Sequence, residues 1–278
     1  MGPSRTLSRC MLQNGGMPFP TGNLATPWRI VKTEPDVVLD ATLAWQDPFE
    51  HVFVKLCSEN RRSIEAVCAW IAQDVGLPVP APRFVRVKKT RLPNGCAWRL
   101  GDADSAIAFA TVAVEGARQL IKVDGDVLQP KLLKWEFLEL AAVFDHLIAN
   151  DDRSNGNMLM DPRGGLWLID HGRSLGGGGQ RFFSTDVLPS IRNFLLEKIG
   201  REASADRMKR RTALMSACVE LEARVPRVPY ERLLVPPAIA PQINSFLSQR
   251  ASRLQAMVLD VVGLPDLYQG DGEVRVPQ

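Results

Sequence analysis

The first part of the chain has few periodic apolar positions, but short apolar runs within it predict β-strands. Segments 51–56 (HVFVKL) and 82–89 (PRFVRVKK) are rich in β-branched and aromatic residues, which favour strands. Segment 105–114 (SAIAFATVAV) predicts a third strand or a connecting segment. Shorter strands are expected near residues 28–31 and 37–39, in a region otherwise rich in glycine, proline and asparagine.

A helix is predicted between the first two of these strands. Residues 63–75 (SIEAVCAWIAQDV) place apolar side chains at helical spacing. Ser63 is a candidate N-cap, and Gly76 with Pro78 predicts the end of the helix. A helix that begins at Ser63 would place Glu65 in its first turn.

Helices dominate the second part of the chain. Pro130 is expected to open a long helix that reaches about Ile148, and its apolar faces indicate a buried position. Two short strands follow, at 157–160 (NMLM) and 166–170 (LWLID), joined by a predicted hairpin turn (DPRGG). Later helices are expected at 187–199, 204–223 and 240–262. The layout predicts an α+β fold with a strand-rich part, residues 1–114, and a helical part, residues 115–278.

Composition limits the classes of protein that fit this layout. The chain has 278 residues, of which 45% are apolar and 23% charged, as in an ordinary soluble protein. A net charge of +3 is too small to indicate a nucleic-acid partner by itself, and no apolar run is long enough for a membrane span. The five cysteines lack a C-x-x-C motif, which argues against a disulfide framework or a zinc site and favours a cytoplasmic location.

The candidate chemistry is concentrated between residues 148 and 178. Asp152 and Asn157 are spaced as D-x-x-x-x-N, a pattern in which the aspartate faces a substrate hydroxyl and the asparagine faces a metal ion. Asp170 ends an apolar strand, and Gly172 completes an Asp-x-Gly turn. Carboxylate and amide oxygens are the ligands that Mg²⁺ prefers.

Aspartate, asparagine and glycine also favour ordinary turns, so each of these motifs alone is weak. The order of a buried helix, D-x-x-x-x-N, a hairpin and Asp-x-Gly favours a magnesium–phosphate site. Asp151 lies next to Asp152 and is the alternative catalytic carboxylate, but the spacing to Asn157 favours Asp152.

The first part of the chain offers groups that complement this site. Lys55 lies on a predicted strand and Glu65 on the following helix, an arrangement that favours an ion pair positioning Lys55 on nucleotide phosphates. Either side chain alone would be equally consistent with a solvated position or with the charge preference of a helix end. Gly15 and Gly16, with Gly22, form a candidate phosphate loop, for which a plain coil is the alternative.

Two further groups of charges have more than one interpretation. Arg153 would contact either substrate phosphate or a carboxylate in a structural ion pair. The basic segment 201–211 (REASADRMKRR) is interpreted as a solvated helix face in preference to a docking site for nucleic acid.

These motifs resemble those of the HipA-like kinases, relatives of the bacterial HipA toxin kinase and, more distantly, of phosphatidylinositol-kinase-like folds. The similarity covers about residues 50–175 and is carried by FVKL, EAVCAWIAQDVGLPVP, FDHLIANDDRSNGNMLM and LWLIDHG. The resemblance implies a two-lobed, protein-kinase-like α+β fold with an adenine-binding hinge near 106–114. It implies that Lys55 binds ATP phosphates and is held by Glu65, that Asp152 is catalytic, and that Asn157 and Asp170 bind Mg²⁺.

The expected activity is ATP- and Mg²⁺-dependent transfer of a phosphoryl group to a serine or threonine hydroxyl of an unidentified protein. The family also makes an antitoxin-like partner conceivable. A kinase of a lipid or small-molecule alcohol is the alternative within enzymes. A catalytically idle nucleotide-binding scaffold, and a nucleic-acid-binding regulator that uses segment 201–211, are the alternatives from other classes.

Overall fold

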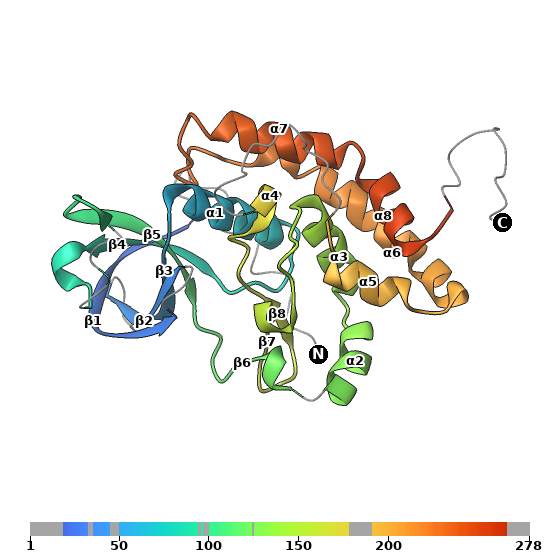
Figure 1. Ribbon diagram of the computed structural model, residues 1–278, viewed down its shortest axis with the longest axis horizontal. Coiled ribbons are helices and arrows are strands. Elements are labelled where there is room, and N and C mark those ends of the chain that lie inside the picture. The colour runs from blue at the N-terminus through green and yellow to red at the C-terminus, as the bar shows by residue number, and fades with distance from the viewer. Residues whose placement is uncertain are drawn as a thin grey trace.

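The computed structural model has a strand-rich N-terminal part and a helical C-terminal part (Figure 1). The residues that it describes are 19–32, 36–44, 50–93, 96, 100–123, 125–177 and 191–265. Among them, no helix is long and apolar enough to cross a membrane.

Five strands of the N-terminal part close into a small barrel in the order β1-β2-β3-β5-β4. Their bounds are Thr21–Lys32 (β1), Val37–Ala44 (β2), Glu50–Leu56 (β3), Pro82–Lys88 (β4) and Ser105–Val112 (β5). Neighbouring strands are antiparallel except β1 and β4, whose parallel pairing closes the barrel. Alternate residues of β2, such as Val37 and Leu39, are buried because successive strand side chains point to opposite faces. The strands predicted at 51–56 and 82–89 are confirmed, whereas β1 and β2 are longer than the short strands expected near 28–31 and 37–39.

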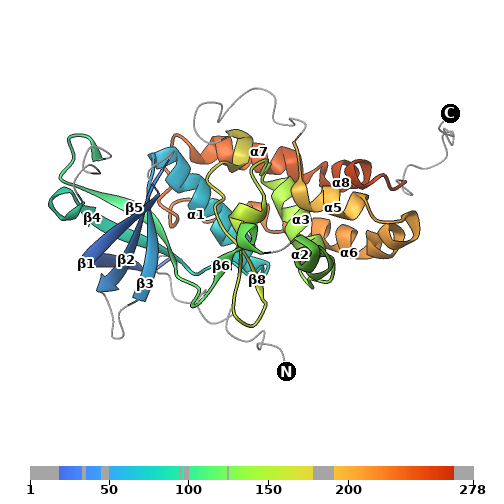
Figure 2. The same ribbon diagram turned by 60° about the horizontal axis from the view of Figure 1, so that its bottom comes forward.

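Helix α1 (Glu59–Asp74) lies between the barrel and the helical part (Figure 2). Every residue from Ser63 to Ala72 is buried, and the apolar ones belong to the same core as the C-terminal helices. The predicted cap was wrong: Ser58 has extended dihedral angles and its Oγ accepts a hydrogen bond from the Arg61 N–H at 3.3 Å. Ser63 lies inside the helix, where its hydroxyl donates to the Glu59 carbonyl at 2.9 Å. Glu65 therefore lies in the second turn and not in the first.

The long helix predicted from Pro130 to Ile148 is two helices. Helix α2 (Gly125–Leu133) contains Pro130 in its interior, and α3 (Leu138–Leu147) follows after a break. The Trp135 N–H bonds the Leu132 carbonyl and the Leu138 N–H bonds the Trp135 carbonyl, so tight turns replace the helix between them. Apolar periodicity could not show this break, because Trp135 and Phe137 continue the apolar pattern through it.

A second, three-stranded sheet lies in the C-terminal part in the order β6-β7-β8. The hairpin of β7 (Met158–Met160) and β8 (Leu166–Leu168) was predicted, whereas β6 (Arg118–Gln119) is too short to give a sequence pattern. After the short α4 (Ser174–Gly177), the remaining helices are α5 (Phe194–Gly200), α6 (Ser204–Glu222), α7 (Ala240–Ala251) and α8 (Leu254–Val262).

The predicted helix 240–262 is divided at Ser252 and Arg253, where the backbone of Arg253 leaves the helical region with φ −118°. The part of the predicted helix 187–199 before residue 191 lies outside the described residues.

Two buried histidines should make the free energy of unfolding depend on pH. His146 and His171 are buried; burial lowers the pKa of His146 to about 3 and lowers that of His171 well below its usual value. Below pH 6.5 the unfolded chain gains protons that the native state excludes, so stability present above that pH is lost as the pH falls. We expect His146 to contribute a loss of about 2 kcal/mol between pH 7 and pH 5, and His171 to add a loss of the same sign.

Urea unfolding at the two pH values measures this loss. A His146→Gln variant should reduce the difference in unfolding free energy between the two pH values by about 2 kcal/mol, whatever its effect on stability at pH 7. An undiminished difference would contradict the assignment to His146.

Candidate active site

Lys55 links strand β3, helix α1 and the turn that follows β8. Its Nζ, on β3, contacts Glu65 Oε1 on α1 and lies 2.9 Å from Oδ1 of Asp170, which follows β8. The side chains of Lys55 and Glu65 are 13% and 3% exposed, so water screens this pair little. The structure therefore brings together three of the residues predicted for the site.

The turn after β8 is shaped to pack against Glu65. Asp170 adopts a left-handed backbone conformation with φ 59°, and the N–H of His171 donates to Glu65 Oε2 at 3.2 Å. A Cβ at position 172 would lie 3.0 Å from Glu65 Oε1, so only glycine fits without displacing that carboxylate. The Asp-x-Gly pattern thus has a packing reason in addition to the chemical one.

The charges of Lys55 and Asp170 favour each other's ionised forms, whereas burial and the charge of Asp170 raise the pKa of Glu65. Burial acts to lower the pKa of Lys55, but the carboxylates of Glu65 and Asp170 outweigh burial and raise it above its usual value. The charge of Lys55 holds the pKa of Asp170 well below its usual range, against the effect of burial. Lys32 Nζ, 3.9 Å from Asp170 Oδ2, acts in the same direction.

Asp152 and Asn157 are directly bonded to each other. The Nδ2 of Asn157 donates to the backbone carbonyl of Asp152 at 2.7 Å and to its Oδ2 at 3.1 Å. The Oδ1 of Asp152 lies 3.4 Å from the Arg173 guanidinium. Asp151 is exposed, and it is Asp152 whose side chain contacts Asn157.

Arg153 joins this segment to the strand that leads to Asp170. Its Nε and one terminal nitrogen bind both oxygens of Asp145 at 2.7 and 3.0 Å, and both side chains are fully buried. Its other terminal nitrogen donates to the carbonyls of Asn157 and Ile169 at 2.6 and 2.7 Å. Of the two interpretations of Arg153, the structure shows the ion pair.

Sequence reasoning missed Asp145, although a carboxylate on the buried face of an apolar helix signals a buried partner. It lies on α3, eight residues before Arg153, and also accepts a hydrogen bond from Asn150 Nδ2 at 2.9 Å. Together Asp145 and Arg153 place Asn157 beside the residue that precedes Asp170.

The remaining sequence-based candidates have different outcomes. Gly15 and Gly16 lie outside the described residues. Gly22 is part of β1 and pairs with Val85 of β4, so this glycine is not in a loop. The segment 106–114, predicted near a hinge, forms most of β5 and the start of the connection to the helical part.

In the basic segment 201–211, several cations are held within the molecule. Arg210 binds Glu202 and Glu139, Lys209 binds Asp206, and Arg207 donates to the carbonyl of Val262. These contacts agree with the interpretation of this segment as a helix face and not as a docking site.

Comparison with known families decides the assignment. The model of a family described as HipA-like kinase matches residues 43–259, which include the Lys55 cluster and the Asp152–Asn157 pair. The chain belongs to the HipA-like kinase family. A search of curated proteins found no match. Kinases transfer a phosphoryl group from a nucleoside triphosphate and use a divalent metal ion to do so.

The residues of this HipA-like kinase fit a nucleotide-bound magnesium ion. Because Asn157 uses its Nδ2 to bind Asp152, its Oδ1 is left to serve as a metal ligand. Asp170 supplies a carboxylate that stays ionised. Among the described residues there is no group of three or more His, Cys, Asp and Glu side chains that would form an all-protein metal cage. Magnesium bound to nucleotide phosphates needs only one or two protein ligands.

Proposed function

We propose that this HipA-like kinase transfers the γ-phosphoryl group of ATP, with Mg²⁺, to a serine or threonine hydroxyl of a protein. The observation that carries the proposal is the double contact of Lys55 with Glu65 and Asp170. Phosphoryl-transfer enzymes use such a lysine, held by a helix acid beside a metal-binding carboxylate, to position nucleotide phosphates. The choice of a protein acceptor rests on the family.

In this proposal, each part of the chain contributes one function. The barrel and α1, within residues 1–114, form one lobe of a protein-kinase-like fold, and residues 115–278 form the other. Lys55 binds the phosphates and Glu65 keeps its ammonium in place, while Asn157 and Asp170 hold Mg²⁺. When bound, Mg²⁺ neutralises charge on the phosphate oxygens. The adenine lies near the segment 106–114 that connects the two lobes.

Asp152 orients the acceptor hydroxyl and accepts its proton as the oxygen forms a bond to the γ-phosphorus. The bond between that phosphorus and the β–γ bridging oxygen breaks, and ADP leaves with the electron pair. The Asn157 Nδ2 bond to Oδ2 of Asp152 fixes the direction in which the carboxylate points. The chain thus supplies position and charge, which are the main contributions to phosphoryl transfer.

Labelling with γ-labelled ATP and Mg²⁺ tests the proposal. We expect the wild-type protein to label a protein acceptor, and Asp170→Asn to lower the rate by on the order of 10²-fold or more, because it removes a charge that binds the metal. Asp260→Asn is a matched control, since Asp260 is exposed on α8. Equal labelling by wild type and Asp170→Asn would end the proposal.

The same experiment separates the alternatives. Label that appears in lipid or small-molecule fractions, and not in protein, would replace the protein acceptor by another alcohol. Stabilisation of the fold by Mg-ATP without transfer to any fraction would favour an idle nucleotide-binding module.

A further inference from the structure

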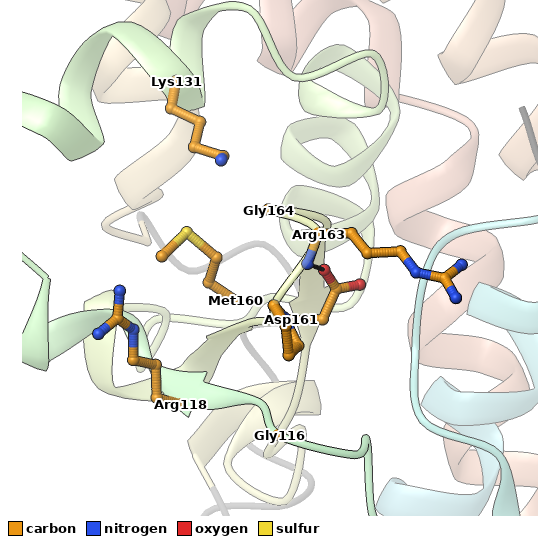
Figure 3. A pocket seen from close by; sticks show the side chains of 8 residues that line it. Gly116, Arg118, Lys131, Met160, Asp161, Arg163 and Gly164 are labelled. Atoms are coloured by element: carbon orange, nitrogen blue, oxygen red, sulfur yellow. Dashed lines mark hydrogen bonds between the residues drawn. The ribbon is translucent and has the colours of Figure 1, made fainter.

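A pocket of about 440 Å³ lies at the tip of the β7–β8 hairpin. Its lining residues do not include Lys55, Glu65 or Asp170. Three segments line it: the chain from Gly116 to Arg118, Lys131 on α2, and the turn from Met160 to Gly164 (Figure 3). Arg118 and Lys131 point toward the same space from opposite sides, with Met160 between them (Figure 3).

The pocket has an excess of positive charge. Arg118, Lys131 and Arg163 line it together with one carboxylate, Asp161. Among the residues that the structure describes, these three cations form no ion pair, in contrast to Arg210 and Lys209 of the basic helix α6. Figure 3 shows that Arg163 points away from the other two, so Arg118 and Lys131 are the cations that face a ligand.

Asp161 is already occupied by the turn in which it lies. Its Oδ1 accepts from the N–H groups of Arg163 and Gly165 at 2.9 and 2.8 Å, and its Oδ2 accepts from Trp167 Nε1 at 3.0 Å. The Trp167 bond and these N–H groups hold the pKa of Asp161 below its usual value. The carboxylate therefore stabilises the hairpin and leaves Arg118 and Lys131 without a counter-ion from this residue.

Two glycines shape the walls of the pocket. Gly116 has φ 66°, and a Cβ there would lie 2.7 Å from Pro162 Cγ, so glycine lets these two walls approach each other. Gly164 has φ 85°, a backbone conformation that favours glycine, and it lies next to the flexible end of Lys131.

The pocket is connected to the predicted catalytic segment. Arg118 pairs with Met160 across the sheet, and Gln119 Nε2 donates to the carbonyl of Gly156 at 3.1 Å. Met160 lies three residues beyond Asn157, a distance of about 10 Å along an extended chain. A ligand in the pocket would therefore contact the strand that follows the catalytic segment.

We propose that this pocket binds the phosphate of a phosphorylated serine or threonine side chain. A phosphoserine carries a charge of about −1.5 to −2 at pH 7, which balances the two facing cations. A ligand with a single carboxylate would balance only one of them. The guanidinium of Arg118 can donate hydrogen bonds to two phosphate oxygens at once, and the ammonium of Lys131 adds a compact positive charge. Met160 and Pro162 supply apolar surface for the carbon atoms that carry the phosphate.

A nucleic acid fits the pocket less well. None of its lining residues is aromatic, so unpaired bases have no ring to stack against, and a few cations in a pocket do not follow a phosphate backbone. The inference concerns binding and does not depend on the transfer reaction proposed for Asp152.

Calorimetric titration of the full chain with a short, otherwise neutral phosphoserine peptide and with its unphosphorylated counterpart tests the inference. We expect only the phosphorylated peptide to bind, and inorganic phosphate to compete with it. Arg118→Gln and Lys131→Gln should each raise the Kd roughly 10- to 100-fold, because each removes a charge-assisted hydrogen bond. Lys134→Gln is the matched control: Lys134 follows the same helix and is exposed, but does not line the pocket.

Four outcomes would overturn the inference. Equal affinity for the two peptides would show that the phosphate is not recognised, and an unchanged Kd in both pocket variants would place it elsewhere. A Kd that rises in Lys55→Met and not in Arg118→Gln would place the phosphate at Lys55 instead. A single-stranded oligonucleotide that binds tightly and displaces the peptide would make a nucleic acid the better ligand.

Discussion

Asp152→Asn is expected to lower the rate of phosphoryl transfer by roughly 10²- to 10⁴-fold, because asparagine cannot accept the proton of the acceptor hydroxyl. The substitution preserves the shape of the side chain. In the wild type Asn157 Nδ2 lies 3.1 Å from Asp152 Oδ2, and the amide oxygen of the new asparagine can accept the same hydrogen bond. The affinity for Mg-ATP and the free energy of unfolding should therefore change little. Initial rates with labelled ATP and a thermal melt measure these quantities.

The neighbouring residue provides the matched control. Asp151 carries the same charge and is exposed, so Asp151→Asn should retain the activity of the wild type. The reverse pattern, with activity lost in Asp151→Asn and kept in Asp152→Asn, would assign the catalytic role to Asp151. Activity kept in both variants would remove general-base catalysis from the proposal.

The second large effect is expected on stability. Arg153→Met leaves Asp145 charged and fully buried without its partner, and such a loss costs about 3–5 kcal/mol of unfolding free energy. The variant also removes two hydrogen bonds from the guanidinium to the carbonyls of Asn157 and Ile169. Urea unfolding at pH 7 measures the loss.

Two comparisons make this prediction specific. The double variant Arg153→Met with Asp145→Leu should recover part of the loss, because no charge is then left buried. Arg192→Met removes a pair with Glu197 in which the arginine side chain is 71% exposed, and should cost at most about 1 kcal/mol. A loss in Arg153→Met as small as in Arg192→Met would contradict the role of the buried pair.

The sequence predicted those features that depend on local pattern. Runs of β-branched and aromatic residues indicated β3 and β4, because this signal acts over a few residues. The contact between Asp152 and Asn157 was not predicted, although their spacing marked both as site residues. That Lys55 reaches Glu65 was also anticipated from a strand followed by a helix.

Features that depend on distant packing could not be predicted. Ser58 and Ser63 are both plausible caps, and only the packing of α1 decides between them. The simultaneous contact of Lys55 with Asp170, 115 residues later, and the Asp145–Arg153 pair both require the tertiary fold. The cationic pocket combines residues from three elements, two of which, α2 as a separate helix and β6, had no clear sequence pattern.

The charges around Lys55 have a consequence for the order in which ligands arrive. The buried Lys55 ammonium faces two carboxylates, and Lys32 lies 3.9 Å from Asp170 Oδ2, so the two cations of this centre are already paired with its two acidic groups. A metal-free nucleoside triphosphate would bring negative charge close to Glu65 and Asp170 with no cation in excess to balance it. If the proposed function holds, the nucleotide is therefore admitted as its complex with a divalent cation, and the protein discriminates against free ATP before any chemistry begins.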